Sequence, residues 1–192
     1  MSSQFEVRFA GLGGQGLILA GIILAEAAIL DDKYVTQTQS YGAATRGGFS
    51  RSDVIISDEE ILFPMATKLD LLLTMSQDAY EEHKECLKKD GVLIIDSTYV
   101  SSDPDHPKSY AIAFSRIARE KFGKENVANI IALGSIVKLF PIISEQSMEK
   151  AILKRVPPAF LEINKKAFKE GLKLASLALK EKKEAHLSDE YD

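Results

Sequence analysis

The sequence is poor in the residues that bind metal clusters or cross-link a protein. Its 192 residues contain a single cysteine, Cys86, and three histidines. One cysteine cannot form an intramolecular disulfide, cannot supply the set of thiolates that an iron–sulfur cluster needs, and excludes a cysteine-rich zinc site. Because an unpaired thiol fits a reducing compartment, we expect a cytoplasmic protein.

Signals of several other protein classes are also missing. The 24 basic and 28 acidic residues give a formal charge of −4, which argues against broad nucleic-acid binding, since a phosphate backbone is bound by a surplus of Lys and Arg. The sequence has no Gly-Lys-Ser or Gly-Lys-Thr, so a P-loop nucleotide hydrolase is disfavoured. Residues 1–8 contain no basic segment ahead of an apolar stretch, and we expect no signal peptide.

The longest run without a charged residue extends from Phe9 to Ala25. Its 17 residues lie at the lower limit for crossing a bilayer, and several glycines interrupt the run. We interpret it as a buried strand, a glycine turn and a buried helix, and expect no membrane span.

A change in the period of the apolar residues divides the chain into strands and helices. Alternation at Phe5, Val7 and Phe9 predicts a first strand, and the apolar segment 17–30 predicts a helix covered on most sides. The near-continuous apolar run at 68–75 indicates a central parallel strand buried on both faces. Further strands are expected at 34–39, 50–56, 92–95 and 110–114, and further helices at 77–88, 115–122, 129–140, 144–155 and 159–183.

This order of elements is typical of an α/β protein. We expect a Rossmann-like, open and mostly parallel sheet with helices on both faces and a helical C-terminal extension. Residues 1–183 are expected to form one domain, and the polar residues 184–192 a disordered tail.

A glycine-rich turn is expected between the first strand and the first helix. It reads Gly11-Leu-Gly13-Gly14-Gln15-Gly16. Glycines permit a tight turn and close approach of a ligand, and a helix N-terminus offers N–H groups to an anion. A dinucleotide site normally has an acidic residue at the end of the second strand, but here that strand ends in Thr-Gln-Thr-Gln, which weakens an NAD interpretation. Glycines that only let the helix and strand pack closely stay open as the alternative.

A second motif follows the second strand and contains Ser40, Tyr41, Arg46, Gly47 and Gly48. Loops that leave the carboxyl ends of strands gather at one edge of an open sheet, so we expect this loop to lie close to the glycine turn. Arg46 has little local bulk to cover it and can offer its planar guanidinium to a carboxylate or phosphate. The Ser40 and Tyr41 hydroxyls are further candidates, although loop hydroxyls commonly bond the local backbone.

The two motifs together resemble those of the gamma subunits of 2-oxoacid:ferredoxin oxidoreductases. The resemblance covers roughly residues 5–180 and includes the length and the βα pattern. It rests on Gly11-Leu-Gly-Gly-Gln-Gly16, Ser40-Tyr-Gly42, Arg46-Gly-Gly48 and Ser50-Arg-Ser-Asp53. The sequence departs from the pattern at residues 43–45, Ala-Ala-Thr, where Pro or Glu is expected in many relatives.

The resemblance implies a complex of EC 1.2.7 type whose other subunits bind thiamine diphosphate and the iron–sulfur clusters. The assembled enzyme would decarboxylate a 2-oxoacid oxidatively, reduce ferredoxin and join the acyl group to coenzyme A. The resemblance favours 2-oxoglutarate, with pyruvate, branched-chain 2-oxoacids and indolepyruvate left open. This chain would assist coenzyme A binding and assembly through the candidate residues Gly11, Gly13, Gly14, Gln15, Gly16, Ser40, Tyr41, Arg46, Gly47 and Gly48, without a catalytic residue or metal ligand of its own.

Two other functions stay open: a stand-alone dinucleotide-binding oxidoreductase, and a pure assembly module whose two motifs form an interface.

Other residues are weaker candidates. His83 and Cys86 share a predicted helix without further ligands nearby, which favours core packing over a metal site. Asp96 ends a predicted strand and could face the ligand edge or cap a helix. Arg51 and Asp53 could form an ion pair.

Overall fold

A six-stranded sheet forms the centre of the protein. The computed structural model describes residues 4–42, 48–101 and 106–189, with side chains described as far as residue 184. The strands lie in the order β2-β3-β1-β4-β5-β6. Their bounds are β1 Gln4–Leu12, β2 Tyr34–Tyr41, β3 Phe49–Ser57, β4 Leu69–Thr74, β5 Leu87–Asp96 and β6 Ser109–Ile112.

The sheet is mostly parallel, as the sequence predicts. Strands β1, β4, β5 and β6 pair in parallel, whereas β3 runs antiparallel to both of its neighbours, β1 and β2. Strands β2 and β3 therefore form a hairpin, and five of the six strands share one direction. After the hairpin the chain crosses β1 to enter β4, so the order of strands reverses between β1 and β4.

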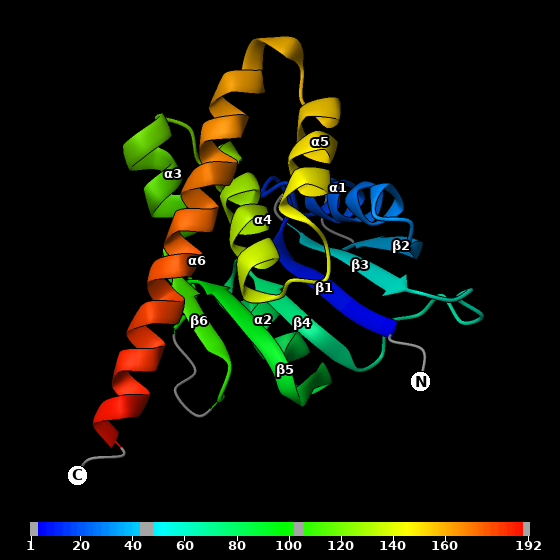
Figure 1. Ribbon diagram of the computed structural model, residues 1–192, viewed down its shortest axis with the longest axis horizontal. Coiled ribbons are helices and arrows are strands. Elements are labelled where there is room, and N and C mark those ends of the chain that lie inside the picture. The colour runs from blue at the N-terminus through cyan, green and yellow to red at the C-terminus, as the bar shows by residue number, and fades with distance from the viewer. Residues whose placement is uncertain (1–3, 43–47, 102–105, 190–192) are drawn as a thin grey trace.

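Helices cover both faces of this sheet, but unequally (Figure 1). On one face α1 lies against the hairpin and β1, and α3, α4, α5 and α6 complete the layer. On the other face α2 contacts β1 and β4. The helix bounds are α1 Leu17–Leu30, α2 Gln77–His83, α3 Phe114–Phe122, α4 Ala128–Leu139, α5 Glu145–Arg155 and α6 Leu161–Asp189.

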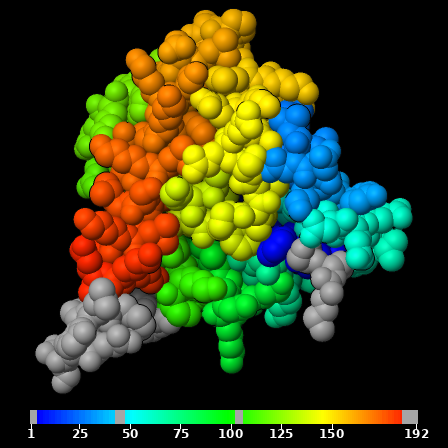
Figure 2. All heavy atoms as spheres, in the orientation of Figure 1, coloured from blue at the N-terminus to red at the C-terminus, as the bar shows by residue number. Residues whose placement is uncertain are grey.

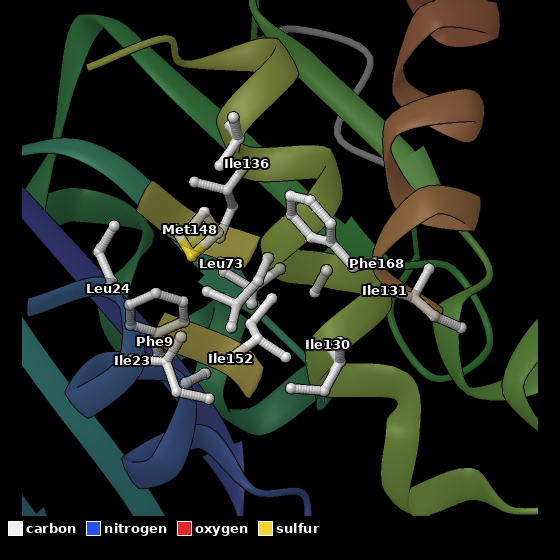
Figure 3. Packing of buried hydrophobic residues seen from close by; sticks show 14 of the residues in the cluster. Phe9, Ile23, Leu24, Leu73, Ile130, Ile131, Ile136, Met148, Ile152 and Phe168 are labelled. Carbon is white, nitrogen blue, oxygen red and sulfur yellow. The ribbon is translucent and has the colours of Figure 1, made fainter. Parts of the chain in front are cut away.

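The main core lies between the sheet and the thicker helical layer. Figure 3 shows Phe9 of β1 and Leu73 of β4 facing Ile23 of α1, Ile130 of α4 and Ile152 of α5. All five side chains are at most 1% exposed. Burying one such side chain stabilises the fold by about 1.5–3 kcal/mol, so the alternation seen in the sequence accounts for this layer.

The boundary between the second helix and β5 differs by several residues from the sequence-based prediction. The second helix ends at His83 rather than Lys88, and β5 begins at Leu87 instead of near Val92. Asp90-Gly91 reads as a helix stop in the sequence, but Gly91 is inside β5, where a Cβ atom would lie 3.0 Å from the Leu69 carbonyl oxygen. Gly91 therefore permits a close approach of β5 to β4 at the irregular pairing near Leu69.

The last helix also extends further than the sequence suggests. Helix α6 continues to Asp189, past residue 184, where the sequence-based prediction begins a disordered tail. Lys182 anchors this end to the sheet, because its Nζ donates to the Ser109 carbonyl oxygen at 3.0 Å and lies 4.7 Å from the centre of the Tyr110 ring. Lys and Glu side chains favour helix, which lets α6 continue beyond its apolar stripe.

Candidate functional site

The candidate site is the edge of the sheet at which β1 and β4 end. Ligands of open α/β sheets bind outside the carboxyl ends of the strands, at the point where the strand order reverses. Here that point lies between β1 and β4, where the glycine turn (residues 11–16) leads into α1 and Met75-Ser76 leads into α2.

Gln15 holds the glycine turn to the end of β4. Its Oε1 accepts a hydrogen bond from the Leu12 N–H at 2.7 Å, and its Nε2 donates to the Met75 carbonyl oxygen at 2.7 Å. A Cβ atom at Gly11 would lie 2.2 Å from this Oε1, so residue 11 is glycine to leave room for the Gln15 side chain. Gln15 was expected to face a ligand; the structure shows that its amide bonds within the protein.

Gly16, at the other end of the turn, is held by a side chain from α4. It has a φ of 73°, the left-handed conformation that glycine adopts most readily. The Asn129 Nδ2 donates to the Gly16 carbonyl oxygen at 3.0 Å, and a Cβ atom at Gly16 would lie 2.4 Å from that nitrogen. Asn129, which sequence analysis did not single out, is buried and fixes the end of the turn at which α1 begins.

The outward side of the turn is free to receive an anion. Gly14 has a φ of 98°, and no atom of the described residues would lie within 4 Å of a Cβ added there. Within the described part of the chain, the N–H groups of Gly14, Gly16 and Leu17 have no hydrogen-bond partner. The first turn of α1 has neither a side-chain cap nor an acidic residue, so nothing local offsets the positive end of the helix dipole.

The described ends of the hairpin loop lie next to this turn, where the sequence predicts them. The Gly13 N–H donates to the Gly48 carbonyl oxygen at 2.8 Å, and the Gly42 N–H donates to Phe49 at 2.7 Å. Tyr41, the last residue of β2, is 66% exposed. Arg46 and Gly47 lie outside the described residues.

A small cavity of about 150 Å³ lies between the hairpin and α2. Ser40 of β2, Arg51 of β3 and His83 of α2 are among the residues that line it, together with Gly11 of the glycine turn. Ser40 therefore faces the α2 side of the sheet, next to the turn.

A buried ion pair lies beside this cavity. The Arg8 guanidinium donates to both carboxylate oxygens of Asp53, at 2.7 and 2.8 Å, and both side chains are about 95% buried. Arg51 reaches the same carboxylate only at 3.5 Å, so the expected Arg51–Asp53 pair is secondary to a pair with Arg8 that sequence analysis did not identify. Burial lowers the pKa of His83, and the positive charge of Arg8 lowers it further.

Asp96 takes the capping role, one of the two alternatives that the sequence left open. It is fully buried, and its carboxylate accepts from the Thr98 N–H at 3.0 Å and the Ser115 N–H at 3.1 Å. The second bond fixes the first turn of α3.

His83 is buried, and the described residues include no group of three or more side chains suited to a metal ion. No helix in the described ranges has the length and apolarity to span a bilayer.

The fold and the turn define an open α/β domain with a glycine-rich turn at the edge where its strand order reverses, a class with many members. A sequence profile described as pyruvate ferredoxin/flavodoxin oxidoreductase matches residues 6–174. The chain belongs to this family.

Relatives and solved structures give closer comparisons. The chain is 48% identical to 2-oxoglutarate synthase subunit KorC of Methanocaldococcus jannaschii, over 88% of this chain and 93% of the relative. It is 37% identical to KorC of Archaeoglobus fulgidus, over 100% of this chain and 98% of the relative. The crystal structure of a keto/oxoacid ferredoxin oxidoreductase gamma subunit from Geobacter sulfurreducens superimposes with a TM-score of 0.83 at 46% identity, covering 92% and 98% of the two chains.

A further structure shows this fold within a longer chain. It is the 2-oxoglutarate:ferredoxin oxidoreductase from Magnetococcus marinus with 2-oxoglutarate, coenzyme A and succinyl-CoA bound. The match has a TM-score of 0.81 and 26% identity, and it covers 91% of this chain but 31% of the other.

Proposed function

We propose that the chain is the gamma subunit of a 2-oxoglutarate:ferredoxin oxidoreductase. In the reaction the complex would release carbon dioxide from the 2-oxoacid, transfer the acyl group to the thiol of coenzyme A, and pass the electrons to ferredoxin. Support for 2-oxoglutarate comes from the KorC relatives, which are 37–48% identical to this chain, whereas a pyruvate synthase subunit PorC is 32% identical.

Partner subunits would carry the redox chemistry. Thiamine diphosphate and iron–sulfur clusters would be bound by other chains, since Cys86 is the only cysteine of this sequence and a cluster needs several thiolates. This subunit would contribute positioning and assembly, not a reacting group.

The contribution that we propose for this chain is to bind coenzyme A at the glycine turn. Coenzyme A carries a pyrophosphate, and the observation that carries the proposal is the open Gly14 surface beside the unpaired N–H groups of Gly14, Gly16 and Leu17. Backbone N–H groups at the positive end of α1 suit a phosphate without needing a side chain. Arg46, in the loop that leads to Gly48, would add a guanidinium that pairs with a second phosphate oxygen.

Gln15 and Asn129 would act on this site without touching the ligand. Each holds one end of the turn, through Met75 and Gly16 respectively, so that the free N–H groups are already oriented before coenzyme A arrives. Preorganised donors lose less entropy on binding than donors on a mobile loop.

The test is steady-state kinetics and calorimetry on the assembled complex. Arg46→Ala should raise the KM and Kd for coenzyme A by roughly 10-fold or more, because a charge-assisted hydrogen bond contributes about 1.5–3 kcal/mol. The KM for 2-oxoglutarate should stay unchanged. Lys180→Ala, which removes a cation from an exposed position on α6, is the matched control and should change neither constant. Unchanged coenzyme A binding in Arg46→Ala would contradict the proposal.

The two alternatives give different results in the same preparations. A pure assembly module predicts that substitutions at Gly13 and Arg46 dissociate the complex while leaving coenzyme A binding intact in whatever assembles. A stand-alone dinucleotide-binding enzyme predicts saturable binding of NAD or FAD by this chain; the end of β2 is Gln39-Ser40-Tyr41, without the acidic residue that binds a ribose. A kcat/KM for pyruvate above that for 2-oxoglutarate would overturn the substrate assignment.

A further inference from the structure

An exposed apolar segment lies at the opposite end of the sheet from the glycine turn. Leu62 is 89% exposed, Phe63 61% and Met65 60%. With Pro64 they form four consecutive residues between β3 and β4, which we call the 62–65 hook. Figure 1 shows the connection from β3 to β4 reaching beyond the end of the sheet, and Figure 2 shows it standing out from the surface. A cluster of exposed large apolar side chains is typical of a surface that contacts another molecule.

The base of the hook is tied firmly to the sheet. On the C-terminal side, the Glu6 carboxylate accepts hydrogen bonds from the Thr67 N–H at 2.5 Å and the Lys68 N–H at 2.9 Å. The buried Arg8 guanidinium donates to the Ala66 carbonyl oxygen at 3.2 Å. On the N-terminal side, the Ser57 hydroxyl accepts from the Glu59 N–H at 3.1 Å.

This combination of a fixed base and an unpacked tip points to docking. A loop that only connects two strands needs no large apolar residues at its tip, and exposing them has a cost in solubility. An apolar tip that is already held in place loses little entropy when it enters a pocket.

The charges beside the hook indicate the chemistry of its partner. Asp58, Glu59 and Glu60 lie one residue before the hook, separated from it by Ile61, and are exposed; Asp58 pairs with Lys33. An apolar pocket with a basic rim would complement this sequence of acids and apolar residues. In a two-fold contact between two copies of the hook, the acidic residues of both copies would approach one another, which disfavours self-association through this surface.

We propose that the 62–65 hook inserts into an apolar, basic-rimmed pocket on a partner subunit of the oxidoreductase complex. The identity of the partner rests on the proposed function. The match with this chain covers 31% of the Magnetococcus marinus chain and 31% of ketoisovalerate oxidoreductase subunit VorA of Methanothermobacter thermautotrophicus. In those proteins the remaining part of the polypeptide is covalently held beside this domain, whereas a separate chain needs a surface that retains its partner.

The experiment uses the co-expressed complex with an affinity tag on a partner subunit. The double variant Leu62→Ser/Phe63→Ser should weaken retention of this chain, raising its dissociation constant by roughly 10-fold or more. Leu177→Ser is the control, since it also replaces an exposed apolar side chain with serine but on α6; Leu177 is 47% exposed. Equal retention of the double variant and the control would overturn the proposal.

A second measurement keeps the test independent of folding. A photo-crosslinking amino acid at position 63 of the purified complex should join this chain to a partner peptide that contains apolar and basic residues. Crosslinks only to another copy of this chain, or no crosslinks, would overturn the proposal.

Glu59→Lys/Glu60→Lys should weaken retention of this chain at low salt more than at high salt. In the complexes that still assemble, the KM and Kd for coenzyme A should match those of the wild type. The docking proposal and the coenzyme A proposal can therefore be refuted independently.

Discussion

Asp53 is the residue on which the α2 side of the site depends most. Its carboxylate accepts both hydrogen bonds from Arg8 and is also the closest anion to Arg51. Burial opposes the charge on Arg8, but the hydrogen bond and charge of Asp53 outweigh it and raise the pKa of Arg8. The guanidinium is therefore charged in the interior, and the Asp53 carboxylate is the buried anion that pairs with it.

Removing that partner should destabilise the protein strongly. We expect Asp53→Asn to lower the free energy of unfolding by about 3–5 kcal/mol, because it leaves a buried cation uncompensated. Asp58→Asn is the control: Asp58 pairs with Lys33 at the surface, and an exposed pair contributes about 0–1 kcal/mol. Urea denaturation measures both changes, and equal effects in the two variants would refute the importance of the buried pair.

Residue-level detail also marks the limit of sequence analysis. The motif from Gly11 to Gly16 and its proximity to the hairpin loop could be predicted, because strand, turn and helix follow one another along the chain. The partners of Gln15, Gly16 and Asp53 could not, since Met75, Asn129 and Arg8 come from other elements. Side chains such as Asn129 carry no local signal, because only the packing of α4 against α1 brings them to the turn.

Among the elements, α4 and α6 make the closest helix contact. A Cβ atom at Gly171 would lie 2.0 Å from the Ile131 carbonyl oxygen, and one at Gly134 would lie 2.3 Å from the Phe168 carbonyl oxygen. The Ser135 hydroxyl donates to the Gly171 carbonyl oxygen at 2.9 Å across the same crossing. The apolar stripe of α6 could be predicted from its period, but this backbone approach could not.

Gly171→Ala should therefore destabilise the protein even though alanine favours helix. The added methyl group meets backbone atoms that cannot rotate away, and we expect a net loss of about 1–3 kcal/mol. The gain in helix propensity, about 1 kcal/mol, should offset only part of this cost. Lys173→Ala, at an exposed position of the same helix, should change the free energy of unfolding by less than about 0.5 kcal/mol. A Gly171→Ala protein as stable as the wild type would contradict the close crossing.

For the molecule as a whole, three perturbed groups make stability depend on pH in one direction. Burial and Arg8 lower the pKa of His83 from its ordinary 6.5. The Arg155 hydrogen bond lowers the pKa of Glu26, and the hydrogen bonds from Ser144 and Ser147 lower the pKa of Asp31 despite its burial. In each case the unfolded chain binds the proton at a higher pH than the folded protein does.

Stability should therefore fall as the solution is acidified. The His83 effect begins below about pH 6.5, where the unfolded histidine takes up a proton first, and the effects of Glu26 and Asp31 follow below about pH 4.5. Between pH 6.5 and 5.5 the free energy of unfolding should fall more in the wild type than in His83→Gln, because only the wild type has a histidine at this position whose pKa is lowered by folding. Denaturation curves at a series of pH values measure the difference, and parallel curves for the two proteins would contradict it.

The hairpin of β2 and β3 has a consequence for how this family can vary. If β2 and β3 were joined by a crossover helix, as in a βαβ unit, β3 would start at the edge of the sheet opposite to the one at which β2 ends. Here β3 begins where β2 stops, so the chain both arrives at and departs from the edge beside the glycine turn. Residues can be inserted or deleted between Gly42 and Gly48 without shifting the register of any strand. The length and charge of the segment that connects β2 to β3 can therefore change independently of the strands on either side of it.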